Sequence, residues 1–251
     1  MSLFANLKSD GLEKTEDRVG GFQPLETDAY TGTIKAFYAT KSQGGANAVN
    51  VILALEGGKE YRETIYVTNR NGENFYLNQN DKTKKVPLPG FVIAEDICLV
   101  TVDKPLSDVI FEDKVMNIYD PEAKREVPKS VPMATELLGK EVTLGIVKQT
   151  VNKNEKAGDG SYVPTADTRD ENFTDKVFHT GTKMTTVEAR NGSEGAVFFN
   201  TWVERNKGNT RDKRTIKDGQ ASNAGQAGRP GGGAPAAGAA GAAPKKSLFG
   251  G

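Results

Sequence analysis

The sequence predicts a mainly β protein, in which a curved antiparallel β-barrel carries a few short helices and is followed by a disordered C-terminal tail. Three observations predict this fold class. Three consecutive segments show the apolar–polar alternation of half-buried strands, a later segment of the same kind has a glycine inside it, and much of residues 219–251 consists of Ala, Gly and Pro. We therefore expect a lead-in over residues 1–27, one β domain over residues 28–218 and the tail over residues 219–251.

The first three strands are expected at residues 31–39 (TGTIKAFYA), 49–55 (VNVILAL) and 61–68 (YRETIYVT). Glycine pairs at 44–45 and 57–58 mark the loop and the tight hairpin between them. Alternation on the third strand sends four side chains to one face: Arg62, Thr64, Tyr66 and Thr68. On the first strand it separates Lys35 and Phe37 from Ile34, Ala36 and Tyr38. Each of the two strands thus supplies a cation and an aromatic ring on one face.

The segment after the third strand is long and polar. Residues 75–77 suit a short strand or a helical turn, and the loop that follows carries Lys82, Lys84 and Lys85. A loop of this length and polarity is either functional or disordered. Residues 90–102 (GFVIAEDICLVTV) suit a buried strand or a helix, and we favour a helix that ends before Pro105.

The next segments predict more β-structure. Residues 114–119 suit a strand, residues 120–132 a proline-flanked hairpin or loop, and residues 133–138 one helical turn. The clearest strand lies at residues 140–153. Gly145 within it indicates a bulge or sharp bend, the device that curls a sheet into a small barrel.

The domain is expected to end with a return strand and two helices. A turn-rich loop at residues 154–161 leads into strands at about 162–169 and 173–178. Helices are expected near residues 185–190 and 196–205. The apolar stripe of the second helix includes Trp202 and is typical of a core contact.

The composition argues against several classes of protein. No apolar run approaches the roughly 20 residues of a membrane span, and the N-terminus has no signal-peptide core, so we expect a cytoplasmic protein, in the host cell if it is phage-encoded. The single cysteine, Cys98, lies in an apolar run and is expected to be a buried, inert thiol. Adjacent carboxylates diverge, no phosphate-binding loop is present, and no His, Asp or Glu cluster has metal-ligand spacing. We therefore predict no enzymatic activity, no cofactor and no metal.

The formal net charge of zero conceals an asymmetry. Residues 204–217 hold six cations and two anions, a net +4, and residues 218–251 hold three cations and one anion, a net +2, so residues 1–203 carry −6. An acidic body argues against a large phosphate-binding surface but allows a local groove. The tail ends in KKSLFGG, where Leu248 and Phe249 form either a partner-binding apolar tip or a chance pair.

A sheet face that carries rings and cations suits a single-stranded nucleic acid, because bases stack on rings and phosphates pair with cations. Taken singly, Phe37 and Tyr66 are more typical of ordinary half-buried sheet positions. A curved antiparallel barrel with long loops is the oligonucleotide-binding (OB) architecture. The expected nucleic-acid-binding residues are Lys35, Phe37, Arg62, Tyr66, Arg70, Tyr76, Lys82, Lys84, Lys85, Lys148 and Lys153.

With the strands TGTIKAFYA, YRETIYVTN and LGKEVTLGIVKQTVNK, and a Gly/Ala/Pro tail with an apolar tip, the chain resembles phage-type single-stranded DNA-binding proteins with an OB-fold core. The resemblance covers most of residues 1–218 in pattern. It implies a sequence-independent binder that coats single-stranded DNA in phage DNA replication and recombination and contacts replication or recombination proteins through its tail. Many single-strand binders end in an acidic tail, whereas this one is basic at Lys245-Lys246. The alternative is a phage protein-interaction or structural adaptor module without nucleic-acid binding.

Overall fold

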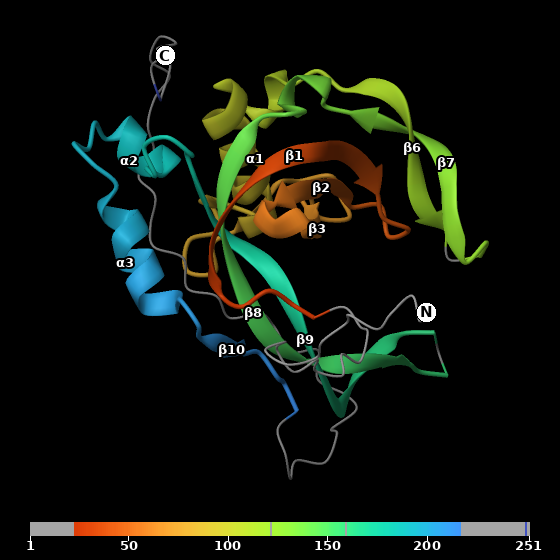
Figure 1. Ribbon diagram of the computed structural model, residues 1–251. Coiled ribbons are helices and arrows are strands. Elements are labelled where there is room, and N and C mark those ends of the chain that lie inside the picture. Colours follow the sequence, from red (N-terminus) through yellow and green to blue (C-terminus); the bar gives the residue numbers. More distant parts are fainter. Residues whose placement is uncertain (1–22, 121, 159, 217–248, 250–251) are drawn as a thin grey trace, which may run out of the picture.

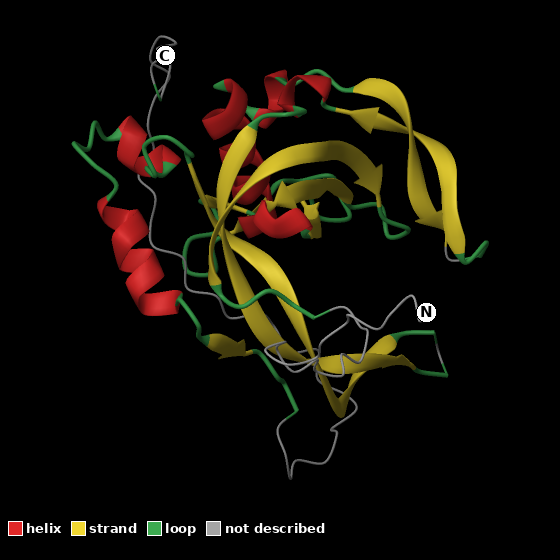
Figure 2. Ribbon diagram, viewed as in Figure 1, coloured by secondary structure: helices red, strands yellow, loops and turns green. Residues whose placement is uncertain are grey.

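The computed structural model describes residues 23–120, 122–158, 160–216 and 249 (Figure 1). Within these residues the chain is mainly β, as predicted, with one large sheet, a separate two-stranded hairpin and helices at the margins (Figure 2). Residues 1–22 of the predicted lead-in, and all of the tail except residue 249, lie outside the described residues.

The strands are β1 (Asp28–Lys41), β2 (Asn47–Leu55), β3 (Glu60–Tyr66), β4 (Phe75–Leu77), β5 (Lys85–Pro87), β6 (Glu112–Asp120), β7 (Arg125–Met133), β8 (Glu141–Lys156), β9 (Tyr162–Phe178) and β10 (Thr210–Asp212). The helices are α1 (Pro89–Val102), α2 (Thr186–Arg190) and α3 (Val197–Asn206), with short 3₁₀ turns at Glu56–Gly58, Leu106–Asp108 and Thr135–Leu137. None of the helices in the described ranges has the length and apolarity needed to cross a membrane.

Strand β1 is shared by two parts of the large sheet. It pairs antiparallel with β2 along most of its length, and its first half also pairs with β8. Near its other end it meets β7 through one ladder pair, Tyr38–Met133. The register with β2 shifts between Ile34 and Ala36, so Lys35 is an extra residue at the point where β1 changes neighbours.

The main core lies between this sheet and helix α1. Its fully buried members include Phe37 of β1, Leu53 of β2, Ile97 of α1 and Ile146 of β8. The helix favoured for this segment is confirmed, with Pro89 in its first turn, where a missing N–H costs nothing. It docks closely on β3, because a β-carbon at Gly90 would come within 2.2 Å of the Tyr66 carbonyl oxygen.

Strands β8 and β9 form a long hairpin that extends beyond the main sheet (Figure 1). The expected loop at residues 154–161 is shorter than predicted, since β8 runs to Lys156 and β9 is continuous from Tyr162. Polar residues pair across this end of the hairpin, as at Asn154–Pro164. An exposed ribbon of this kind has no buried face, so no apolar alternation marks it in the sequence.

A bulge or sharp bend was predicted at Gly145, and the register between β8 and β9 shifts directly after this residue, with Asp175 of β9 as the extra residue. A β-carbon on Gly145 would lie 2.8 Å from the ring of Trp202. The ring is held by a 2.7 Å hydrogen bond from its Nε1 to Asp175 and is buried with Val147 and Phe178. Trp202 of α3 is therefore a core contact, as predicted, whereas Val197 of the same stripe is 71% exposed.

The edge between β3 and β9 is closed by side chains. No hydrogen-bond ladder joins these two strands within the described part of the chain. Instead the carboxylate of Glu63 accepts bonds from the Thr174 hydroxyl at 2.6 Å, the Thr174 N–H at 3.1 Å and the Tyr61 hydroxyl at 2.8 Å. The edge of β3 is thereby fixed to β9 through one acidic side chain.

Candidate functional site

The face of β1–β3 that points away from the main core is a grid of nine side chains. Cross-strand pairing sets three rows: Ala36–Ile52–Arg62, Tyr38–Asn50–Thr64 and Thr40–Ala48–Tyr66. Asn50 ties the grid together. Its amide donates to Thr40 Oγ1 at 2.8 Å and accepts from Thr64 Oγ1 at 2.6 Å. We call this grid the floor.

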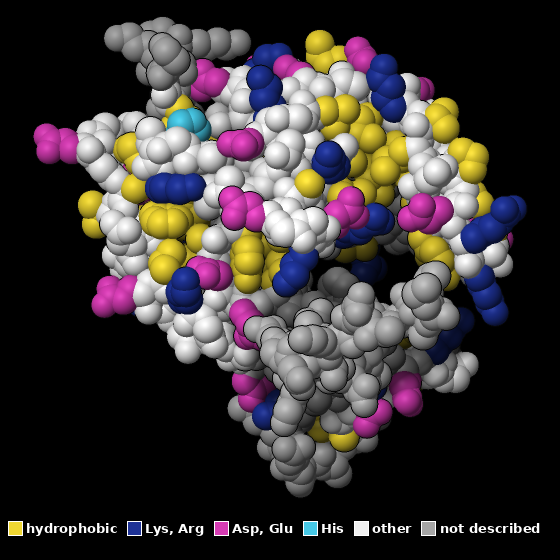
Figure 3. Space-filling view, in the orientation of Figure 1, with side chains coloured by type: hydrophobic (Ala, Val, Ile, Leu, Met, Phe, Trp, Pro, Cys, Tyr) yellow, Lys and Arg dark blue, Asp and Glu magenta, His cyan; other side chains and the backbone are white. Residues whose placement is uncertain are grey.

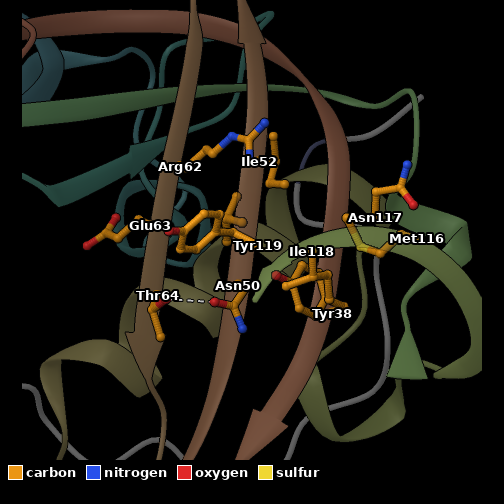
Figure 4. Close-up of a pocket in the computed structure, with 11 residues that line it drawn as sticks. Tyr38, Asn50, Ile52, Arg62, Glu63, Thr64, Met116, Asn117, Ile118 and Tyr119 are labelled. Carbon is orange, nitrogen blue, oxygen red and sulfur yellow. Dashed lines mark hydrogen bonds between the residues drawn. The ribbon is translucent and has the colours of Figure 1, made fainter. Parts of the chain in front are cut away.

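The β6–β7 hairpin stands beside the floor as a wall. Val131 and Met133 of β7 pack with Ala36 and Tyr38 in a small apolar cluster that also receives Met116 and Ile118 of β6. Figure 4 shows side chains of both parts around one opening, with Tyr119 and Ile118 from the wall and Arg62 and Asn50 from the floor. The wall is thus seated on the floor by apolar side chains rather than by an extended ladder.

The space between floor and wall is an open hollow of about 220 Å³ that adjoins a second one of about 400 Å³ near Tyr66. Both hollows are lined by the same central residues: Tyr38, Asn50, Thr64 and Ile118. We therefore treat them as one groove. Figure 3 shows apolar, basic and acidic side chains close together at the right of the molecule, where Figure 1 places the β6–β7 hairpin. Tyr66 is 53% exposed and Tyr119 is 58% exposed, so each offers an accessible ring.

Two of the cations in the groove are paired with nearby carboxylates. The cations that line it are Lys41, Arg62 and Lys129. Arg62 pairs with Glu60 at 2.8 Å and lies 4.0 Å from Glu126 of the wall, and Lys129 pairs with Asp120 at 2.8 Å. The hydrogen bond from Lys129, with further bonds from two backbone N–H groups, lowers the pKa of Asp120 to about 2. The Arg62–Glu60 pair is exposed, and exposed ion pairs contribute only ~0–1 kcal/mol, so a phosphate can replace Glu60 at small cost. The side chain of Asp120 is only 21% exposed and accepts three hydrogen bonds, so it is held more firmly.

Two of the residues predicted from sequence, Arg62 and Tyr66, line the groove. Phe37 does not, and its prediction is corrected: it is 0% exposed in the main core and has no face for a base. The error is one of parity, because Tyr38 shares the face of Arg62 and Phe37 shares that of the core. Lys35 is exposed at the bulge and is not among the residues that line the groove.

The remaining predicted residues lie elsewhere in the fold. Tyr76, Lys82, Lys84 and Lys85 belong to the β4–β5 hairpin, where the Lys85 ammonium lies 4.3 Å from the centre of the Phe75 ring. Arg70 follows β3. Lys148 of β8 pairs with Glu26 at 2.9 Å and Asp170 at 3.7 Å. Lys153 lies on the outer part of the β8–β9 hairpin. None of them lines the two hollows that make up the groove.

Sequence reasoning missed most of the groove. The floor residues Tyr38, Asn50 and Ile52 could have been found from the parity of Arg62, had the register of β1 and β2 been known. The wall residues Tyr119 and Lys129 carried no signal, because nothing local to residues 112–133 indicates that this hairpin packs against β1.

No protein-family model matches this chain, and no curated protein matches it significantly. Within the described residues, no group of three or more His, Cys, Asp or Glu side chains is placed to hold a metal ion. The arrangement itself therefore supplies the functional argument: an open groove with accessible rings, exchangeable cations and an amide–hydroxyl network.

Proposed function

We propose that this protein binds single-stranded DNA without sequence preference, in the groove between β1–β3 and the β6–β7 hairpin, and acts in phage DNA replication or recombination. The observation that carries the proposal is the pair of exposed rings, Tyr66 and Tyr119, in one groove with Arg62 and Lys129. Bases stack on such rings whatever their identity, since every base has a π-face, while phosphates pair with the cations.

We also propose that the domain is an OB-type module. Three features support this: a three-stranded meander, a helix (α1) that lies between the meander and the later strands of the large sheet, and later strands that return to β1. In this proposal the Glu63–Thr174 contact closes the β3 edge, where a ladder would close a regular barrel.

The groove favours a weakly charged mode of binding. Two of its three cations, Arg62 and Lys129, already face carboxylates, so few phosphates are neutralised and stacking supplies most of the affinity. Each stacked base contributes ~1–3 kcal/mol, and each phosphate contact on a single strand adds about 0.7 to the slope of log affinity against log salt. We expect a shallow salt dependence, with a slope corresponding to roughly two or three phosphate contacts.

The proposal is tested by fluorescence anisotropy of labelled oligo-dT with the full chain at several salt concentrations. Tyr66→Ala is expected to weaken binding roughly 5- to 150-fold through the loss of one stacked base. Arg62→Gln is expected to weaken binding and to lower the salt slope by about 0.7. Tyr162→Ala is the matched control, because Tyr162 is 69% exposed at the outer end of the β8–β9 hairpin.

Three results would count against nucleic-acid binding in this groove. They are no binding at low salt, binding that is indifferent to salt, and equal losses from Tyr66→Ala and Tyr162→Ala. Thermal unfolding of each variant must match that of the unsubstituted chain, so that a loss of affinity reports the groove and not the fold.

The second candidate is a protein-interaction module. It is favoured by the apolar wall, in which Met116 and Ile118 stand beside Ile52, and by the mixed charge of the groove. An extended peptide with alternating apolar side chains would suit this surface. A chain that fails to bind oligo-dT but captures such a peptide, with loss of capture in Ile52→Asp, would replace the first proposal with this one.

A further inference from the structure

The loop after β9 presents the single histidine of the chain as a fixed ring. The backbone N–H of His179 donates to Met184 O at 2.9 Å, and its carbonyl accepts from the Lys183 N–H at 2.8 Å. The ring Nδ1 lies 3.1 Å from the backbone N–H of Thr182 and 3.0 Å from its hydroxyl. Because a backbone N–H can only donate, Nδ1 is the acceptor and the neutral ring carries its proton on Nε2.

Phe249, near the C-terminal end of the chain, lies on this ring. The centres of the His179 and Phe249 rings are 4.3 Å apart and their planes are inclined by only 17°. Phe249 is partly buried and also packs against the main core. Burial, and then the nearby Lys183 ammonium, lower the pKa of His179, which favours the neutral ring that stacks on an apolar partner.

We propose that the His179 loop is a docking site for an aromatic side chain and that its ligand is Phe249 of the same chain. The apolar tip of the tail is then held on its own domain, and any partner that recognises Phe249 must displace it from His179. The site is separate from the groove, since none of the residues that line the groove belongs to this loop. Figure 1 shows α2, which follows the loop, on the other side of the sheet from the β6–β7 hairpin.

The sequence between the domain and Phe249 makes this contact favourable within one chain. In the sequence, 32 residues lie between Ile216, the last described residue of the domain, and Phe249. Covalent linkage makes the docking of Phe249 an intramolecular event, with an effective concentration that separate molecules reach only in concentrated solution. One stacked ring binds weakly between separate molecules, and linkage favours the contact within one chain.

The single histidine makes the test unambiguous. In proton–carbon NMR spectra of the full chain labelled at histidine, the ring resonances of His179 are expected upfield of their positions in Phe249→Leu, because the ring current of the phenylalanine is lost. Phe249→Trp is the conservative variant and is expected to retain the upfield shift. Phe198→Leu is the control, since Phe198 is 39% exposed on α3 and does not stack on His179.

Two further measurements show whether the Phe249 ring that stacks on His179 belongs to the same chain. The shift is expected to be independent of protein concentration; a shift that grows with concentration would mean docking between copies and would overturn the intramolecular assignment. Addition of the peptide KKSLFGG to the full-length Phe249→Leu variant is expected to restore the upfield shift, whereas KKSLAGG is not. Identical histidine spectra for the unsubstituted chain and Phe249→Leu would overturn the proposal, whatever the outcome of the oligo-dT experiment.

Discussion

Replacement of Glu63 tests how the β3 edge is held. Among the described residues, Glu63 of β3 is the side chain that accepts hydrogen bonds from both the N–H and the hydroxyl of Thr174 on β9. Thr174 is 6% exposed. Its hydroxyl also lies 3.3 Å from the Tyr61 hydroxyl and keeps that partner when the carboxylate is removed, so its N–H is the donor that loses its acceptor. One unsatisfied buried donor gives a loss of about 1–3 kcal/mol in the free energy of unfolding for Glu63→Ala.

The matched control is Glu60→Ala on the same strand. Glu60 pairs with Arg62 at the surface, with both side chains about half exposed, at 47% and 58%. Removal of an exposed pair costs about 0–1 kcal/mol. Both variants are measured by urea unfolding, followed by the fluorescence of Trp202, which is the only tryptophan. A loss for Glu63→Ala no larger than that for Glu60→Ala would refute the assigned role of the carboxylate.

The pH dependence of Glu63→Gln gives an independent check. Burial raises the pKa of Glu63 above its ordinary value of 4.5, although the hydrogen bonds from Thr174 and Tyr61 oppose the shift. The folded state then holds this proton more tightly than the unfolded state, so the charged form is the destabilising one. Relative to Glu63→Gln, the unsubstituted chain is most stable below pH 4.5 and loses this advantage as the pH rises through the raised pKa. A stability difference that stays constant between pH 4 and 7 would contradict this argument.

Three further predictions concern other parts of the chain. Gly145→Ala is expected to lower the free energy of unfolding by about 1–3 kcal/mol, because its β-carbon would lie 2.8 Å from the fixed Trp202 ring. Gly158→Ala is the control and should be neutral, because nothing lies within 4 Å of its β-carbon; equal urea midpoints for the two variants would contradict the packing argument. Glu126→Gln removes a carboxylate that lies 4.0 Å from Arg62 and is expected to tighten oligo-dT binding up to about fivefold at low salt. Weaker binding would argue against the replacement of this carboxylate by a DNA phosphate at Arg62. Burial raises the pKa of the Cys98 thiol, so at pH 8 this thiol is expected to react with a thiol reagent only when the protein unfolds. Rapid reaction of the native protein would contradict this prediction and would show that the core opens around Cys98.

The elements were largely predictable because each has a local signal. The three-strand meander follows from alternation, α1 from an apolar run too long for one strand, and the Gly145 bend from a glycine inside a strong strand pattern. The outer β8–β9 hairpin was predicted with too long a loop and with a break in its return strand, because both of its faces are exposed and its residues are polar. β10 was missed because three residues, Thr210–Asp212, carry no periodicity.

The groove was less predictable, because it depends on register and on long-range packing. Simple alternation placed Ile34 with Ala36 and Tyr38, which is wrong, because the bulge at Lys35 shifts the parity and Ile34 lies in the main core with Phe37. Alternation also does not say which side chains of β1 join Arg62. That choice is made by the pairing of Tyr38 with Asn50 and of Asn50 with Thr64. Phe37 was predicted as a base-stacking residue only because it is aromatic, and its ring is instead fully buried in the main core.

The way in which the wall is attached has a consequence for binding. The floor strands are joined by continuous ladders, whereas the β6–β7 hairpin meets β1 through the pair Tyr38–Met133 and a 2.8 Å hydrogen bond from Ala134 N to Phe37 O. Beyond that point the wall rests on apolar side chains, which tolerate small displacements better than a ladder does. The width of the groove therefore depends on an attachment that has few backbone hydrogen bonds. Single-stranded DNA bound between Tyr66 of the floor and Tyr119 of the wall would fix that width. Slower amide hydrogen exchange in β6 and β7 on addition of oligo-dT is therefore the expected signature of binding in this groove.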